Sequence, residues 1–272
     1  MEISFVKINP AGNITVIVLD QLPRCAYRDV AGQIMSPRGL GAEQVGFAER
    51  SRIRTSAGRL HMMGGEFCGN ASRAFGAWLA FRGHPGITWQ GQQAAVPIEV
   101  SGYEDVLRVG VSMGQGGRPV RASSLMPVPQ RISRIWFRDS EIALVEFPGI
   151  THAVVWEEEA TEETFREVAA ICGAEAVPAF GVMFFNETKA EMVPLVAVRD
   201  SGSLVWEGSC ASGSVAVASA LAARDCQSKE KVCLRQPRGE LLVCVDWDGK
   251  VVSAEVSGSL EIVAVGTAFV AI

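Results

Sequence analysis

The sequence predicts an α/β (α+β) protein of two similar domains, each a curved, mostly antiparallel sheet or barrel around a central helix. Two observations carry this prediction. A short polar turn that contains a cysteine and runs into an alanine-rich segment occurs twice, at residues 66–75 and 208–217. Each copy is followed by a pair of segments with the alternating pattern of strands. A unit of this kind repeated in order favours two related halves.

The repeated segment predicts a buried helix in each half. Its copies align Cys68 with Cys210 and Ser72 with Ser214. After each cysteine, about three helical turns are apolar on nearly every side, which suits a helix enclosed by other elements. Each cysteine is therefore expected at or near the N-terminus of its helix.

A hairpin is predicted after each helix. Residues 96–101 and 106–113 form the first pair of alternating segments. Residues 241–246 and 251–257 form the second pair, which turns at Asp248-Gly249, a strong hairpin signal. Both halves therefore continue from helix to antiparallel strands in the same order.

Other segments complete the two sheets. Residues 14–18 alternate as a strand in the first half, and strands are expected near 134–138 and 142–147 in the second. One surface helix is predicted to begin after Thr161 as N-cap and to end at Gly173. The glycine-rich stretch 114–119 is the natural boundary between the halves. The predicted domains are residues 1–118 and 119–272, and the sequence leaves open whether the last strand returns to the first half.

Composition limits the function classes. The 272 residues carry a formal net charge of −5, which gives no electrostatic reason to expect nucleic acid or a membrane surface as partner. The N-terminus lacks the pattern of a signal peptide, and no run is long enough for a membrane span, so we expect a cytoplasmic protein. The number of cysteines, seven, is odd and argues against a disulfide framework. No histidine pair has metal-ligand spacing, so no metal is expected. Cysteines outside the repeat are interpreted as structural: Cys25, Cys172, Cys226, Cys233 and Cys244.

Two thiols at helix N-termini suit the inversion of an amino-acid α-carbon. One thiolate removes the α-proton, and the other thiol returns a proton from the opposite face. A helix N-terminus lowers a thiol pKa, and its free N–H groups bind a carboxylate. Glu207, three residues before Cys210, is the candidate to hold the substrate ammonium group. No signature of a pyridoxal phosphate site is visible, so we expect no cofactor.

Four motifs occur in an order that resembles the diaminopimelate epimerase superfamily: Phe5-Val6-Lys7 with Ala11-Gly12-Asn13, Gly41-Ala42-Glu43-Gln44-Val45, Cys68-Gly69-Asn70, and Glu207-Gly208-Ser209-Cys210-Ala211-Ser212-Gly213. The resemblance implies two α/β domains of similar fold, no cofactor, and catalysis by Cys68 and Cys210. By matching position it implies that the substrate site is lined by Asn13, Gln44, Gly69, Asn70, Glu207, Ala211 and Ser212.

Departures from the superfamily pattern concern the substrate. Gly208 stands where diaminopimelate epimerase has the arginine that holds a distal carboxylate, and Gly149-Ile150-Thr151-His152 lacks an asparagine of that clamp. Segments 62–71 and 206–210 are more similar to the histidine racemases of opine-type metallophore pathways. Histidine racemisation for metallophore biosynthesis is therefore the leading hypothesis.

Several alternatives stay open. The substrate could be another single-carboxylate amino acid or diaminopimelate. A thiol redox sensor and a non-catalytic binding relative are the alternatives from other classes. His61 and His152 are interpreted equally well as core residues and as substrate contacts. The expected partner is a small amino acid, and the sequence leaves open whether the chain forms a homodimer.

Overall fold

The computed structural model describes residues 1–199 and 202–271. The chain divides into two compact units. Unit 1 consists of Met1–Leu125 and Ser257–Ile272, and unit 2 consists of Met126–Val256. Each unit has its own helices, strands and core, so each is described separately.

Unit 1 contains nine strands and two α-helices among its described residues. Its elements are β1 (Glu2–Asn9), β2 (Thr15–Val18), a short 3-10 helix (Arg24–Ala26), α1 (Tyr27–Met35), β3 (Gln44–Glu49), β4 (Arg59–Met62), α2 (Gly69–Phe81), β5 (Thr88–Gln90), β6 (Gln93–Val100), β7 (Leu107–Met113), β8 (Pro119–Leu125) and β18 (Glu261–Phe269). Most neighbours pair antiparallel, including β18 with β1 and β6 with β7. The pairs β2–β3 and β4–β6 are parallel. The hairpin predicted over 96–101 and 106–113 is confirmed.

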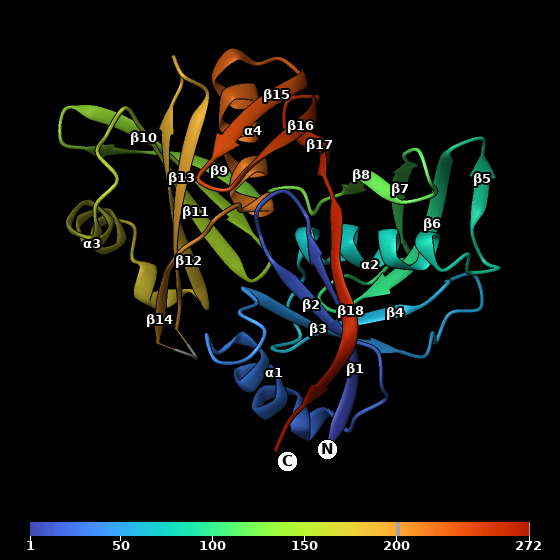
Figure 1. Ribbon diagram of the computed structural model, residues 1–272. Coiled ribbons are helices and arrows are strands. Elements are labelled where there is room, and N and C mark those ends of the chain that lie inside the picture. Colours follow the sequence, from blue (N-terminus) through green and yellow to red (C-terminus); the bar gives the residue numbers. More distant parts are fainter. Residues whose placement is uncertain (200–201, 272) are drawn as a thin grey trace. The chain divides into compact units, whose positions relative to one another are not determined.

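Helix α2 is the central element of unit 1 (Figure 1). It packs against β6, β7 and β8 and also against strands from the N-terminal part of the unit. Ala71, Ala74 and Ala77 are fully buried, because small side chains let the surrounding strands approach the helix closely. Gly76 lies so near β7 that an added Cβ would stand 2.6 Å from Val109. The predicted buried helix after Cys68 is confirmed.

Unit 2 has a similar composition of elements. They are β9 (Arg131–Phe137), β10 (Ser140–Phe147), β11 (Ile150–Trp156), α3 (Glu162–Ile171), a 3-10 helix (Ala174–Ala176), β12 (Ala179–Asn186), β13 (Glu191–Val198), β14 (Ser203–Trp206), α4 (Ala211–Asp225), β15 (Lys229–Gln236) and β16 (Gly239–Trp247). Strand β17 (Val251–Ser259) continues into unit 1. The strands pair mostly antiparallel, with β11–β12 as the main parallel pair. Helix α4 packs against β11, β15 and β16 and is buried along most of its length.

The surface helix predicted after Thr161 is α3. The Thr161 hydroxyl accepts a hydrogen bond from the backbone N–H of Thr164 at 3.1 Å, which is the bond expected of an N-cap residue. Gly173 follows the helix with a φ of 65°, the left-handed conformation that glycine adopts without a steric penalty. Both ends of this helix are therefore as predicted.

Helix α1 is not among the predicted elements. Its buried side chains are Tyr27, Val30, Ala31 and Ile34, which recur at the spacing of one helical face. They pack on Phe47, whose ring stacks on Tyr27 with centroids 3.7 Å apart. The periodicity that predicts this helix is therefore present in the sequence.

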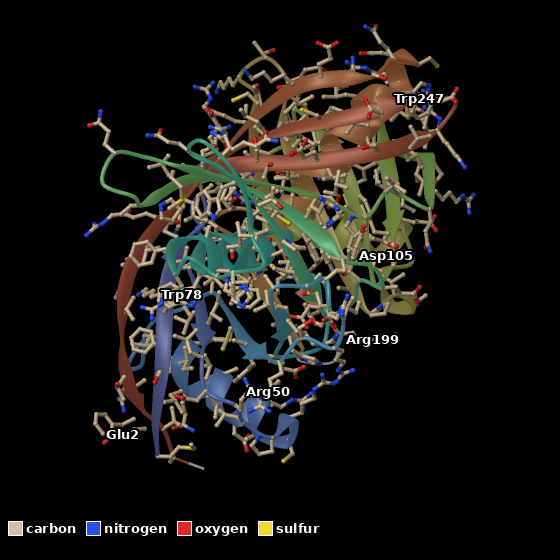
Figure 2. All side chains as sticks on the ribbon, turned by 90° about the vertical axis from the view of Figure 1, so that its right-hand side faces the viewer. Glu2, Arg50, Trp78, Asp105, Arg199 and Trp247 are labelled. Carbon is tan, nitrogen blue, oxygen red and sulfur yellow. The ribbon has the colours of Figure 1, made fainter. Side chains whose placement is uncertain are left out.

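Charged side chains lie mainly at the surface, as Glu2, Arg50 and Asp105 do in the view with all side chains (Figure 2). In the part of the chain that the structure describes, no helix combines the length and apolar character needed to cross a bilayer.

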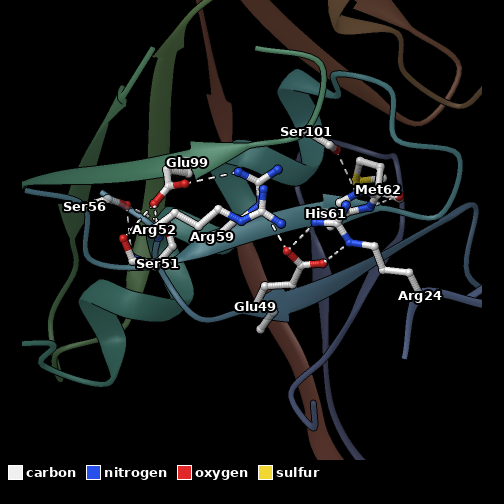
Figure 3. Close-up of polar contacts among 12 residues, drawn as sticks. Arg24, Glu49, Ser51, Arg52, Ser56, Arg59, His61, Met62, Glu99 and Ser101 are labelled. Atoms are coloured by element: carbon white, nitrogen blue, oxygen red, sulfur yellow. Dashed lines mark hydrogen bonds and ion pairs between the residues drawn. The ribbon is translucent and has the colours of Figure 1, made fainter. Parts of the chain in front are cut away.

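An exception to this surface placement is an ion-pair network in unit 1 (Figure 3). Arg24 donates two hydrogen bonds to the carboxylate of Glu49, each 2.8 Å long. Arg59 bridges Glu49 and Glu99 at 3.1 Å from each. Burial opposes ionisation of Glu49, but the bonds from Arg24 and Tyr27 outweigh it and lower its pKa to about 2. The network therefore joins β3, β4 and β6 through charge-assisted bonds.

Replacement of Glu49 by glutamine is expected to lower the free energy of unfolding at pH 7 by about 2 kcal/mol. Since the folded-state pKa is depressed, the carboxylate stabilises the fold above its unfolded pKa and loses this effect as the pH falls from about 4.5 towards 2. Urea denaturation of the wild type and Glu49→Gln across this range measures the difference. Glu104→Gln, which changes an exposed residue, is the control. A difference in the free energy of unfolding between the wild type and Glu49→Gln that stays constant down to pH 3 would contradict this account.

Candidate active site

The first thiol is the N-cap of α2. Cys68 has an extended backbone (φ −136°, ψ 111°), and its sulfur accepts a hydrogen bond from the backbone N–H of Ala71 at 3.3 Å. The hydroxyl of Ser72 donates to the Cys68 carbonyl oxygen at 2.7 Å. The sulfur thus lies at the positive end of the helix dipole, which favours a thiolate.

The second thiol has the same geometry. Cys210 is the N-cap of α4 (φ −121°, ψ 112°), and its sulfur accepts from the backbone N–H of Gly213 at 3.3 Å. Ser214 donates its hydroxyl to the Cys210 carbonyl oxygen at 2.6 Å. The alignment of the two segments in the sequence therefore corresponds to an identical local structure, and the prediction that each cysteine begins a helix is confirmed.

The surroundings of the two thiols differ. Cys68 is half-buried and donates a hydrogen bond from its thiol to Gln44 Oε1 at 2.8 Å. Cys210 is only 6 % exposed. Burial raises the pKa of Cys210, and the nearby carboxylate of Glu207 raises it further. The pKa of Cys210 is therefore higher than its position at a helix N-terminus alone would make it, which favours the protonated thiol.

In unit 1, the structure brings Gln44 to Cys68 directly. Gln44 is the first residue of β3. Gly69 and Asn70 form the first turn of α2, and both are buried. Asn13 lies in the loop between β1 and β2 and is 1 % exposed. This loop turns through Gly12, whose φ of 92° requires a glycine-like conformation.

In unit 2, Glu207 and Ser212 both lie beside Cys210. The Ser212 hydroxyl is 3.5 Å from the Cys210 sulfur, and Ala211 is the buried first residue of α4. Glu207 is half-buried, and its backbone N–H donates to the carbonyl of Pro194 on β13 at 3.1 Å. The segment before α4 is thereby fixed to the sheet.

Two residues from other strands hold this helix start, and of these the sequence singled out His152 but not Gln236. Gln236, at the end of β15, accepts a hydrogen bond from the Cys210 backbone N–H at 2.7 Å and donates to the Ser214 hydroxyl at 3.0 Å. His152 on β11 lies 2.9 Å from the Ser212 hydroxyl through Nε2. Both come from strands distant in sequence, so only the fold brings them to Cys210.

Residues 2–269 match the family described as "Histidine racemase CntK N-terminal domain". The chain belongs to this histidine racemase family. A relative named histidine racemase from Fusobacterium nucleatum subsp. nucleatum is 34 % identical over 98 % of this chain and 97 % of its own length. Another of that name, from Staphylococcus aureus (strain Mu50), is 24 % identical over 98 % of both chains.

The fold of the histidine racemase family member described here is a mixed α/β fold, as predicted. A probable proline racemase from Agrobacterium radiobacter K84, solved with bound carbonate, superposes with a TM-score of 0.71 at 14 % identity. That match covers 99 % of this chain and 93 % of the other. The resemblance inferred from segments 62–71 and 206–210 is confirmed at the level of the family.

The two histidines left open by the sequence occupy different places. His152 is fully buried, and burial lowers its pKa to about 3, so its imidazole is neutral near pH 7. His61 is half-buried, its Nδ1 lies 2.7 Å from the carbonyl oxygen of Met62, and its ring meets Tyr27 edge-on. His152 is therefore a core residue that also contacts a predicted site residue, Ser212.

Gly181 makes room for His152. A Cβ at this position would stand 2.4 Å from His152 Nδ1 and 2.9 Å from the terminal methyl group of Met183. Gly181→Ala is expected to displace the imidazole and lower the free energy of unfolding by about 1–3 kcal/mol. Urea denaturation checks this, with Gly32→Ala in helix α1 as the control because its added methyl meets nothing within 4 Å. Equal stability of Gly181→Ala and the wild type would contradict the placement of His152.

The remaining cysteines do not share the helix-start geometry. Cys172 and Cys226 lie at the C-terminal ends of α3 and α4, and burial raises the pKa of Cys172. Cys25, Cys226 and Cys244 are exposed. Among the described residues, no group of three or more metal-ligating side chains comes together.

Proposed function

We propose that the protein is a cofactor-independent histidine racemase, an isomerase, in which Cys68 and Cys210 act as opposed base and acid. The matched capping of α2 and α4 by these two cysteines carries the proposal. The family and its relatives support histidine as the substrate.

In the proposed reaction, one cysteine is a thiolate and the other a thiol when the substrate binds. The thiolate removes the α-proton from one face, and the thiol donates a proton to the other face, which inverts the centre. The thiolate and thiol have then exchanged protonation states, and the reverse reaction uses them in the opposite roles. No oxidant or electron sink is consumed.

Helix N-termini would stabilise the charge that develops at the substrate carboxylate. The N–H groups of the first residues, Gly69 and Asn70 in α2 and Ala211 and Ser212 in α4, are the proposed ligands of this carboxylate. They are fixed before the reaction, so little reorganisation is needed as the carbanion forms.

The other predicted residues take roles that follow from their chemistry. Glu207, beside Cys210, would bind the substrate ammonium group. Gln44, bonded to Cys68, and Asn13, buried in the β1–β2 loop, would complete the proposed binding site. Gly208 stands at the position where diaminopimelate epimerase has the arginine that holds the second carboxylate, and this difference disfavours diaminopimelate as the substrate. We place the reaction in the cytoplasm, where both thiols stay reduced, and the resemblance to opine-type pathways supports a role of the D-histidine product in metallophore synthesis.

The test is a panel of free L-amino acids, including histidine and diaminopimelate, incubated with the purified reduced protein without added cofactor. Chiral chromatography should show D-histidine approaching the level of L-histidine. Racemisation of a different amino acid in preference to histidine would overturn the substrate assignment. Failure to racemise any of them would overturn the enzyme class.

A further inference from the structure

Gln236, the last residue of β15, binds the start of α4 through both ends of its side-chain amide. Its Oε1 accepts a hydrogen bond from the backbone N–H of Cys210 at 2.7 Å, and its Nε2 donates to the Ser214 hydroxyl at 3.0 Å. The Ser214 hydroxyl in turn donates to the carbonyl oxygen of Cys210 at 2.6 Å. The bonds therefore close a ring that begins and ends at the backbone of Cys210.

The donors and acceptors of this ring fit in one direction only. A backbone N–H can only donate, so the end of the Gln236 amide that faces Cys210 is its oxygen, and the NH2 end then faces Ser214. A carbonyl oxygen can only accept, so the Ser214 hydroxyl gives its hydrogen to Cys210 and receives the amide on a lone pair. Since Ser214 is fully buried and Cys210 nearly so, water competes little with these bonds.

The strand end that carries Gln236 is itself fixed. Gln236 pairs with Gly239 across the turn of the β15–β16 hairpin. In the same turn, the backbone N–H of Arg238 donates to the carbonyl oxygen of Gly208 at 3.0 Å. The hairpin end therefore binds the chain before Cys210, at Cys210 and after it.

The ring fixes the direction in which the Cys210 side chain leaves the backbone. An N-cap residue has non-helical dihedral angles, so the regular helix does not set them. Bonds to the N–H and to the carbonyl of Cys210 hold the peptide planes on its two sides, and hence its φ of −121° and ψ of 112°. The Cα–Cβ bond is thereby fixed, and with it the region that the sulfur can reach.

The bonds of the ring do not depend on the protonation state of the thiol. The Cys210 sulfur also accepts the N–H of Gly213 at 3.3 Å, but a neutral thiol is a weak acceptor. In the proposed reaction Cys210 alternates between thiolate and thiol, so this cap bond weakens once in every cycle. The ring consists of amide, hydroxyl and backbone groups, which keep their bonds in both states.

We propose that Gln236 is a positioning residue, which holds Cys210 through its backbone in the same place as thiolate and as thiol. This inference rests on the proposed function, because it assigns a role in proton transfer. Proton transfer depends steeply on geometry, and a displacement of about 1 Å can lower a rate about 100-fold. Gln236 acts through Cys210 and is not itself a catalytic residue.

The contact is tested first, in the reduced protein without substrate. Hydrogen exchange of the Cys210 amide is followed by NMR in the wild type, in Gln236→Met and in Gln130→Met. Methionine has nearly the shape of glutamine but cannot accept the N–H, so the Cys210 amide should exchange at least about ten-fold faster in Gln236→Met. The amide of Val217, in the middle of α4, is the internal reference and should change less. Gln130→Met changes an exposed residue of unit 2 and should leave both rates unchanged.

The positioning role is tested by the kinetics of racemisation from both enantiomers. Gln236→Met should lower kcat about 10- to 100-fold and leave the KM within about three-fold, since the proposed substrate ligands are unchanged. The isotope effects of α-deuterated L- and D-histidine should also move apart. Breaking of the α-carbon bond becomes more rate-limiting for the enantiomer on which Cys210 is the base, and less so for the one on which it is the acid. Loss of folded protein alone lowers the rate and changes neither isotope effect.

Ser214→Ala removes the other side chain of the ring and places a good helix former in α4. It should change kcat and the isotope effects in the same direction, and it decides the test if Gln236→Met does not fold. The double variant should be no slower than Gln236→Met, because both side chains act through one ring.

An unchanged exchange rate of the Cys210 amide in folded Gln236→Met would overturn the contact. A fall in kcat with unchanged isotope effects would overturn the positioning role. If the wild type racemises no amino acid, the proposed function fails, whereas faster exchange of the Cys210 amide in Gln236→Met would still support the contact with Gln236.

Discussion

Cys68→Ser and Cys210→Ser are each expected to reduce the rate of histidine racemisation at least about 1,000-fold. A serine hydroxyl is a much weaker acid than a thiol, so it is not ionised near pH 7 and cannot serve as the base. The fold should survive. Serine is a strong N-cap residue, so its hydroxyl can accept the N–H of Ala71 or Gly213 that the sulfur now accepts. Initial rates in both directions, from L- and from D-histidine, measure the loss.

The matched control is Cys244→Ser, an exposed cysteine on β16 that should keep full activity. Circular dichroism of each variant separates loss of chemistry from loss of structure. Wild-type rates in a folded Cys68→Ser or Cys210→Ser variant would show that one thiol suffices and would refute the two-base scheme.

Glu207→Gln is expected to have the second-largest effect, a fall in kcat/KM of about 100-fold or more, since it removes the proposed partner of the substrate ammonium group. The same change should lower the pKa of Cys210, because the Glu207 carboxylate now raises it in addition to burial. The rate profile against pH should therefore move to lower pH while the rate itself falls.

Steady-state kinetics from pH 6 to 10 measure both effects, with Glu191→Gln, an exposed residue of β13, as the control. A loss of activity without a shift of the pH profile would leave Glu207 a binding residue but contradict its action on Cys210. An unchanged kcat/KM would contradict both roles.

The features that could be predicted from the sequence are those encoded by neighbouring residues. Cys68 and Cys210 cap helices through N–H groups three positions further on, and Thr161 caps α3 in the same way. Such contacts close within one helical turn, so the local sequence contains all of their parts. The hairpin of β6 and β7 is similarly local. Helix α1 belongs to this class, because its apolar spacing is visible at residues 27–34.

The residues that could not be predicted act over long distances in the sequence. His152 and Gln236 reach the start of α4 from β11 and β15, and no spacing rule connects them with Cys210.

The most direct test of the central claim follows deuterium at the α-carbon during the first few per cent of conversion. L-histidine is incubated with the reduced protein in D₂O, and mass spectrometry of the separated enantiomers gives the label in each. Two opposed thiols predict that the newly formed D-histidine carries one deuterium while the remaining L-histidine stays unlabelled, because the proton is returned by a different group from the one that removed it. Label that enters the remaining L-histidine as fast as it enters the product would contradict this account, because it would show a single base serving both faces.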